Sequence, residues 1–271
     1  RLANNDQTGR WPAKAAMPAE GSIVPYKRVV AFYGNFYSAN MGILGEYPTP
    51  VLLEKIKAQT SLWKDADSLT EVVPAIHYIA VTAQRSAGDG YYRLRMPEKE
   101  IMKAFALGDS ISGLVFLDIQ PGLSNLQQEL PRLEKYFQRG NVHLGIDAEY
   151  SMKSGKTPGS AIGSFDAADI NFATEWLQTI VLKYKLPPKM LVVHRFTSPM
   201  LTNYQKINYC KIMKNRTFLY SLLVVLLVNV SISFAQEKTH KAVFHLSTSD
   251  TLAYDALHIQ LNNVLNHWPT A

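Results

Sequence analysis

A long uncharged segment inside the chain constrains its architecture more than any other feature. Residues 217–235 (TFLYSLLVVLLVNVSISFA) make up 19 positions without a formal charge, directly after the cationic run 213–216 (MKNR). A short cationic region, an apolar stretch and small residues at the −3 and −1 positions are typical of a secretory signal peptide. Ser233 and Ala235 occupy those two positions. The pattern therefore predicts cleavage before Gln236.

Two other interpretations of this segment stay open. It is long enough for a membrane-spanning helix, which needs about 20 apolar residues, with Lys211, Lys214 and Arg216 on the cytoplasmic side. The segment could also be a buried core helix, but it lacks the polar stripe at the helical period that such a helix usually has. In each case we expect a hydrophobic helix, with membrane contact through residues 217–235 if they are not cleaved. A signal peptide belongs at an N-terminus, so its internal position favours a fusion of two coding sequences near Met213.

The chain is therefore predicted to contain four successive parts. Residues 1–25 are rich in Asn, Gly and Pro and have little periodicity, which indicates a flexible lead-in. Residues 26–207 form a truncated first domain, and residues 213–235 are the hydrophobic segment. Residues 236–271 are the start of a second exported protein.

The last part has the pattern of one strand and one helix. Residues 241–246 are apolar, residues 247–250 (STSD) supply helix-start residues, and apolar positions then recur at helical spacing. So short a piece buries too little surface to fold alone. The runs VFHLSTSD and LNNVLN resemble the beginning of DsrE-type sulfur-relay domains, which use a cysteine where they carry sulfur. No cysteine follows Cys210, so we expect no sulfur transfer.

Composition excludes several classes of partner and cofactor. The net charge of +6 is spread along the chain, and no basic run is dense enough to follow a phosphate backbone, so no nucleic-acid partner is expected. The single cysteine, Cys210, cannot form an internal disulfide. The sequence has no G-x-G-x-x-G, P-loop or G-x-S-x-G motif, so neither a nucleotide cofactor nor serine hydrolysis is predicted. His240, His245, His258 and His267 have spacings that fit no compact metal site.

Strand and helix patterns alternate through the first domain. Apolar strand patterns occupy residues 28–35, 74–84, 113–120, 142–150 and 189–196. Helical patterns occupy residues 49–66, 96–108 and 166–184, and a further helix begins after Ser124 and contains Pro131. This alternation predicts an α/β domain with a parallel sheet, either doubly wound or a barrel.

The polar ends of the strands favour the barrel. One face of residues 142–150 is apolar, whereas the other turns acidic toward its C-terminal end, with Asp147 and Glu149. The corresponding faces of two other strands end in Asp118 and Gln120 and in Tyr33 and Asn35. A polar rim at the C-terminal ends is typical of (β/α) barrels. Since a closed barrel has eight strands, five strands predict an incomplete barrel with exposed edges.

The same rim supplies the candidate chemistry. Asp147 and Glu149, two apart on the predicted strand, should point the same way with Cα atoms roughly 7 Å apart. Asp118 should lie beside them. We expect Glu149 to act as general acid/base, with Asp147 and Asp118 tuning it or binding sugar hydroxyls, as in glycoside hydrolysis. The residues expected to line the mouth are Tyr33, Asn35, Gln84, Gln120 and His194.

Two alternatives for these acids stay open. They could be solvated strand ends or helix caps, since clustered titratable groups mark a site only probabilistically. They could also bind a hard cation such as Ca²⁺ or Mg²⁺, which needs several oxygen ligands. None of the candidate site residues is predicted to be a metal ligand.

Residues 29–207 resemble a group of secreted or lipid-anchored bacterial proteins associated with a glycoside-hydrolase-like (β/α) barrel. The runs that carry the resemblance are FYGN, MGILGEYP, AVTAQ, VFLDIQPGLS, LPRLEKY, VHLGIDAEYSM, IGSFDAADIN and PPKMLVVHRFT. The resemblance implies a barrel, an extracytoplasmic setting and carbohydrate or cell-wall hydrolysis, with no particular substrate. A truncated copy is expected to be inactive. The alternatives are a non-catalytic carbohydrate- or envelope-binding domain and a single-pass membrane protein.

Overall fold

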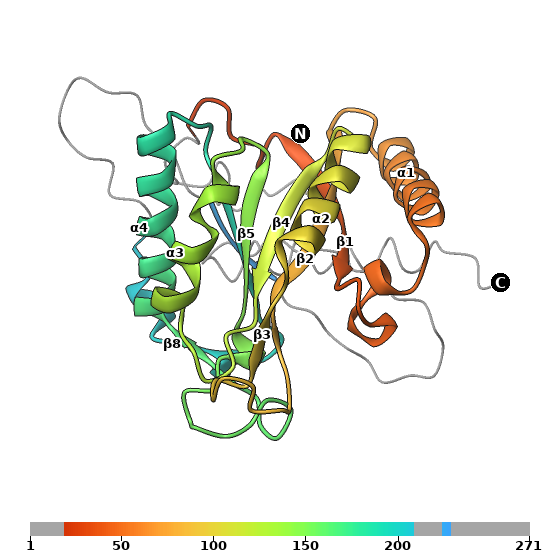
Figure 1. The fold of residues 1–271 in the computed structure, drawn as a ribbon. Coiled ribbons are helices and arrows are strands. Elements are labelled where there is room, and N and C mark those ends of the chain that lie inside the picture. The colour runs from red at the N-terminus through yellow and green to blue at the C-terminus, as the bar shows by residue number, and fades with distance from the viewer. Residues whose placement is uncertain (1–18, 209–223, 229–271) are drawn as a thin grey trace, which may run out of the picture.

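The computed structural model describes residues 19–208 and the backbone of residues 224–228. Strands and helices alternate through most of this range (Figure 1). In chain order the strands and α-helices are β1 (Lys27–Gly34), α1 (Thr49–Ala66), β2 (Glu71–Ala83), β3 (Arg93–Arg95), α2 (Glu98–Ser110), β4 (Leu114–Ile119), α3 (Leu126–Phe137), β5 (Val142–Asp147), β6 (Phe165–Asp166), α4 (Ala167–Tyr184), β7 (Met190–His194), β8 (Leu201–Thr202) and β9 (Val224–Val228).

The main sheet has the winding of a barrel. Strands β1, β2, β4, β5 and β7 are parallel and lie side by side in chain order. A doubly wound sheet instead reverses its strand order at a switch point, and this sheet has no such reversal among the described strands. The fold is therefore an α/β fold with a curled, half-barrel parallel sheet of five strands, as the sequence predicts.

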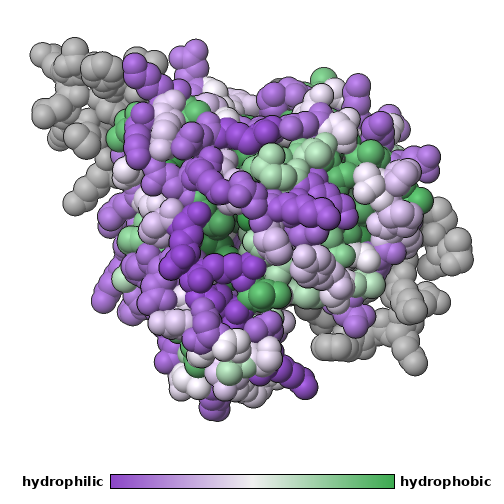
Figure 2. Space-filling view, in the orientation of Figure 1, coloured by the Kyte–Doolittle hydropathy of each residue, from purple (hydrophilic) through white to green (hydrophobic). Residues whose placement is uncertain are grey.

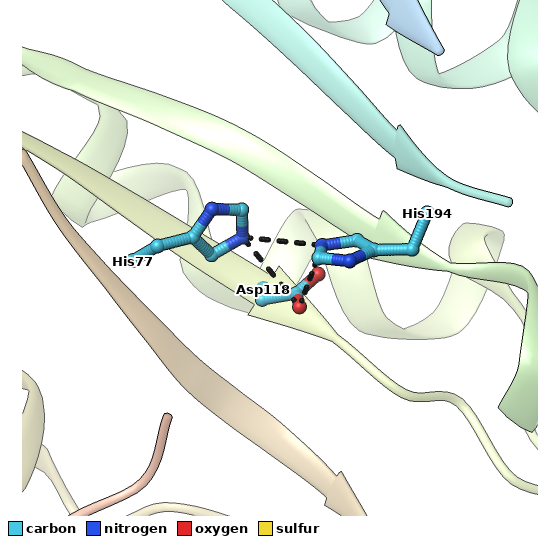
Figure 3. Close-up of side chains that lie close together, drawn as sticks. All are labelled: His77, Asp118 and His194. Atoms are coloured by element: carbon cyan, nitrogen blue, oxygen red, sulfur yellow. Dashed lines mark hydrogen bonds and ion pairs between the residues drawn. The ribbon is translucent and has the colours of Figure 1, made fainter. Parts of the chain in front are cut away.

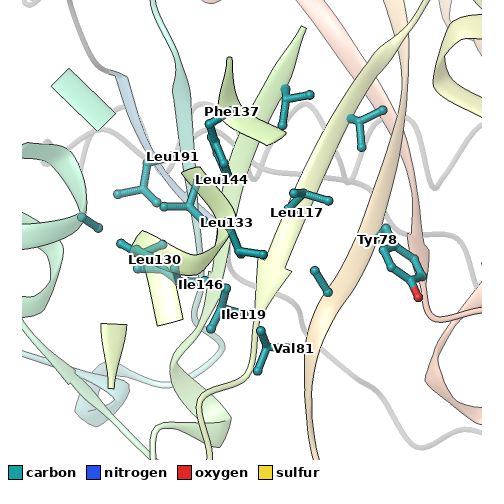
Figure 4. Packing of buried hydrophobic residues seen from close by; sticks show 14 of the residues in the cluster. Tyr78, Val81, Leu117, Ile119, Leu130, Leu133, Phe137, Leu144, Ile146 and Leu191 are labelled. Carbon is teal, nitrogen blue, oxygen red and sulfur yellow. The ribbon is translucent and has the colours of Figure 1, made fainter. Parts of the chain in front are cut away.

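The outer face of this sheet is covered by helices α1 to α4 (Figure 1). Successive side chains of a strand point to opposite faces, so every second residue of a strand faces the helices. The outward-facing Leu117 and Ile119 of β4 and Leu144 and Ile146 of β5 have no exposed surface, and they pack with helix residues such as Leu130 (Figure 4). The solvent side of the helices is mostly hydrophilic (Figure 2).

The inner face of the sheet has a smaller apolar layer near the N-terminal ends of the strands. It contains Ala31, Ala75, Phe116 and Val192, which all lie at inward-facing positions. Val24, from the segment before β1, packs against the same layer. Toward the C-terminal ends of the strands the inward-facing residues become polar, as described below.

Two boundaries differ from the sequence predictions by three residues each. β5 ends at Asp147, and a 3₁₀ turn over Ala148–Tyr150 follows it, so the strand predicted to reach residue 150 is three residues too long. β2 begins at Glu71, before the predicted start at residue 74. The shorter β5 matters for the site, because Glu149 then lies on the turn rather than on a strand face.

The hydrophobic segment also departs from its prediction where it is described. Val224–Val228 is a strand, β9, that pairs in parallel with β7 from Met190↔Val224 to His194↔Val228. The helix expected there is therefore wrong for these five residues. The run VVLLV is uniformly apolar and rich in β-branched valine, a sequence pattern typical of strands in parallel sheets. It also pairs with the backbone groups of β7, which would otherwise form an open sheet edge.

The other parts of the predicted organisation fall outside the described residues. These are residues 1–18, which hold most of the expected lead-in, and residues 209–223 and 229–271, which hold the rest of the hydrophobic segment and the DsrE-like fragment. Among the described residues, no helix is both long and apolar enough to cross a membrane.

A buried ion-pair network ties strand β3 to helix α3. Glu129, 1% exposed, accepts hydrogen bonds from Arg93 Nε at 2.9 Å and Arg95 Nε at 2.7 Å. Ser124 Oγ donates to the same carboxylate, and Arg93 also binds Asp89. A buried charge requires such partners. Glu129 therefore holds strand β3 and the loop between β2 and β3 against the first turn of α3.

Replacing Glu129 with alanine should destabilise the domain strongly. The substitution leaves the guanidinium of Arg93 buried with one carboxylate partner fewer, and breaking a buried pair costs about 3–5 kcal/mol. Urea unfolding followed by circular dichroism measures the loss. Glu134→Ala is the matched control, since this helix α3 residue pairs with exposed Lys183 at the surface. Equal losses in the two variants would contradict the structural role of Glu129.

Candidate functional site

Five polar side chains meet on the inner face of the sheet near the C-terminal ends of its strands. Five neighbouring parallel strands contribute one each: Tyr33 from β1, His77 from β2, Asp118 from β4, Asp147 from β5 and His194 from β7. We call these five residues the inner cluster. Parallel strands bring their C-terminal ends to one edge, so residues far apart in sequence become neighbours.

Asp118 and the two histidines form the centre of this cluster (Figure 3). Asp118 Oδ2 lies 3.1 Å from His194 Nε2 and 3.5 Å from His77 Nε2, and the two Nε2 atoms are 3.4 Å apart. All three side chains are at most 10% exposed. Tyr33 packs against both imidazole rings, with ring centroids 5.2 Å apart in each case.

Gly145 on β5 makes room for this centre. A Cβ atom at this position would lie 2.4 Å from His77 Nε2 and 2.7 Å from Asp118 Oδ1, closer than real contacts allow. The strand that separates β4 from β7 therefore carries no side chain at this level. His77, Asp118 and His194 can meet across β5 for that reason.

Gln120 connects the centre to Asp147 and Tyr33. Its Nε2 donates to Asp147 Oδ2 at 3.2 Å and to the Tyr33 hydroxyl at 3.4 Å. Its Oε1 accepts from the backbone N–H of Ala83 at 3.1 Å. With all of these bonds the amide has one orientation, and it holds the Asp147 carboxyl in place. The other oxygen of Asp147 accepts from the backbone N–H of Glu149 at 3.0 Å.

The charges at the centre are set by Asp118. Burial opposes its ionisation, but the nearby imidazoles of His194 and His77 outweigh that effect and hold the pKa of Asp118 below its usual value. Burial also disfavours the charged form of His194, and the Asp118 carboxylate overcomes it, so the pKa of His194 rises to about 9. For His77 burial prevails over the attraction of Asp118 and lowers its pKa. At neutral pH the centre therefore holds an Asp118–His194 ion pair beside a neutral His77.

The remaining two carboxyls hold protons more tightly than usual. Burial, with repulsion from Asp118 and Glu149, raises the pKa of Asp147 to about 7 although His194 opposes the shift. Burial also raises the pKa of Glu149, which is half-buried. A carboxyl that exchanges its proton near pH 7 beside an ionised one is an arrangement suited to general acid–base chemistry.

The structure unites five of the eight predicted site residues. Tyr33, Asp118, Gln120, Asp147 and His194 lie in or against the inner cluster, through the contacts given above. Glu149 lies beside it on the 3₁₀ turn, so the prediction that Asp147 and Glu149 share one face of a strand is wrong.

Asn35 and Gln84 have other surroundings. The Asn35 amide donates to the carbonyl of Ile79 at 3.0 Å and accepts from the N–H of Tyr37 at 2.8 Å, which anchors the loop after β1. The Gln84 amide nitrogen lies against Gly88 in the loop after β2.

His77 is the site residue that the sequence prediction misses. The strand pattern over residues 74–84 ends in the polar residue Gln84. If the alternation of side chains were regular back from Gln84, His77 would lie on the outer face. The pairing of β2 with β4 shifts register between Ile79 and Val81. This irregularity inserts one residue and reverses the alternation, so His77 faces inward. The regular alternation that begins at inward-facing Ala75 does place His77 on the inner face.

Comparison with models of protein families, with curated proteins and with solved structures finds no match for this chain. The site is therefore interpreted from its own geometry.

Gly145→Ala should disrupt the inner cluster and destabilise the domain. The added methyl group needs space that His77 and Asp118 occupy, and overpacking of this kind costs about 1–3 kcal/mol. Urea unfolding measures the change. Gly140→Ala is the control, because its nearest neighbours would be Pro187 carbons at 3.5 and 3.6 Å, an ordinary contact. A Gly145 variant as stable as the Gly140 variant would show that the close approach is not a constraint.

Proposed function

We propose that residues 26–207 are the first five strands of a (β/α) barrel that hydrolyses carbohydrate or cell-wall glycan outside the cytoplasm. One observation carries the proposal: carboxylates and imidazoles from successive parallel strands converge at the C-terminal ends of the inner face. Active sites of barrel enzymes lie at this end. The extracytoplasmic setting rests on the resemblance of the domain to secreted barrel proteins.

Within this proposal Glu149 is the proton donor to the glycosidic oxygen. It lies at the end of β5 on the turn Ala148–Tyr150 and is more exposed than Asp147, so a substrate at the rim can reach it. Burial raises the pKa of Glu149, which favours its acid form, although His194 opposes the shift. Asp147 lies behind it, bound to the Glu149 backbone N–H and to Gln120, and repulsion from Glu149 helps to raise the pKa of Asp147.

The truncation explains why this chain should not turn over substrate. A closed barrel takes eight strands, and its second catalytic carboxylate can come from a strand that follows β7. Glycoside hydrolysis needs two carboxyl groups placed about the scissile bond. The proposed activity therefore belongs to a complete barrel, and the fusion near Met213 interrupts it.

The test uses a chain in which residues 26–207 continue into the remaining barrel strands. Glu149→Gln should lower kcat about 10²–10⁴-fold, the usual contribution of general acid–base catalysis, with little change in KM. Release of reducing ends from purified cell-wall glycan measures the rate. Glu134→Gln, on the surface of α3, is the control and should keep full activity. Unchanged kcat in the Glu149 variant would exclude it as the proton donor.

A binding domain without catalysis is the second candidate, and exposed tyrosines favour it. Tyr37, Tyr91 and Tyr204 are 58%, 36% and 43% exposed and lie in loops after β1, β2 and β8, around the site. Tyrosine offers an apolar face with a hydrogen-bonding tip, which suits the faces and hydroxyls of sugar rings. Glycan binding that survives Glu149→Gln without any hydrolysis would favour this candidate over the enzyme.

A further inference from the structure

The three central side chains of the inner cluster are arranged like ligands about one point. Asp118 Oδ2, His77 Nε2 and His194 Nε2 form a triangle with sides of 3.1, 3.4 and 3.5 Å. Around a tetrahedral metal ion with bonds of about 2.0–2.1 Å, neighbouring ligand atoms lie about 3.3–3.4 Å apart. Among the described residues, His77, Asp118 and His194 form a group whose ligand atoms lie close enough together to hold one metal ion.

The orientation of the carboxylate agrees with this arrangement. Oδ1 of Asp118 accepts a hydrogen bond from the Ile119 backbone N–H at 3.0 Å, which fixes the plane of the carboxylate. Oδ2 faces the two imidazoles, with the Nε2 atom of His194 at 3.1 Å and that of His77 at 3.5 Å. The carboxylate therefore turns one oxygen toward the backbone and the other toward the same point as the two Nε2 atoms.

The scaffold holds the three groups rigidly. They come from β2, β4 and β7, and Gly145 on β5 leaves the space between them free of a side chain. The ring of His77 also stacks on Phe116, with centroids 5.1 Å apart and an interplanar angle of 15°. Sites built on strands with packed side chains keep their geometry better than sites on loops.

We propose that His77, Asp118 and His194 bind one divalent transition-metal ion, with zinc as the ion that fits best. Two imidazoles and one carboxylate are typical ligands of catalytic zinc, which keeps a fourth position for water or substrate. Two nitrogen ligands disfavour the hard ions Ca²⁺ and Mg²⁺, which take oxygen ligands. The sequence alone predicts no metal ligand, so this site emerges only from the structure. The proposal does not depend on the proposed glycan hydrolysis.

Zinc binding to the full chain tests the site directly. Protein freed of metal with a chelator is titrated with Zn²⁺ alone, and bound metal is counted by elemental analysis after gel filtration. His77→Gln and Asp118→Asn should each lose one tightly bound equivalent, with affinity about 100-fold lower or more, since even residues supporting the ligands contribute 10–100-fold. His143→Gln is the matched control. His143 is another buried histidine of the inner face, but it accepts a hydrogen bond from the Met190 N–H and lies outside the triangle.

Two further readouts separate a lost ligand from a damaged fold and from weaker sites elsewhere. His240, His245, His258 and His267 are present in every variant, so any zinc they bind cancels in the comparison. Zinc should raise the thermal midpoint of the wild type and of His143→Gln and leave that of Asp118→Asn unchanged. Co²⁺ in place of zinc should give the visible absorption of a tetrahedral site. Equal zinc content and equal thermal shifts in wild type and Asp118→Asn would overturn the proposal, as would equal loss of zinc in the His143 control.

Discussion

One buried carboxylate constrains the whole inner half of this domain. Asp118 has no exposed surface, and an ionised carboxylate withdrawn from water requires compensating charge. His194 supplies that charge from β7, and His77 from β2 supplies a polar neighbour. Gly145 then follows as a necessity, because any side chain at that position of β5 would separate these partners. A single buried charge thus accounts for residues on four strands.

The winding of the sheet determines where this charge can lie. Because the five strands follow one another without a reversal, helices cover one face, and strand side chains together with Val24 line the other. That inner face is divided into two layers. Phe116 lies at their boundary, packed against His77 on one side and His143 on the other. The apolar layer on its N-terminal side packs with Val24, and the polar layer on its C-terminal side holds the inner cluster.

The sequence predicts those parts of the site that follow from regular alternation. On β4 and β5 every second residue falls on the expected face, so the alternation alone places Asp118 and Asp147 together. Prediction fails where the alternation breaks. The register shift after Ile79 conceals His77, and the early end of β5 moves Glu149 onto a turn. Gly145 is also invisible to pattern analysis, because its role depends on two side chains from other strands.

The apolar segment near the C-terminus is a second place where the sequence pattern does not determine the structure. Its uniform apolarity predicts a signal peptide or a membrane helix, yet Val224–Val228 pairs with β7 as a sixth parallel strand. Strands buried in parallel sheets read as continuous hydrophobic runs, and so do the apolar cores of export signals. Valine, which makes up three of these five residues, favours the extended conformation once a partner strand is available. The open edge of a half-barrel provides that partner, so a segment suited to export is equally suited to cover the edge of β7.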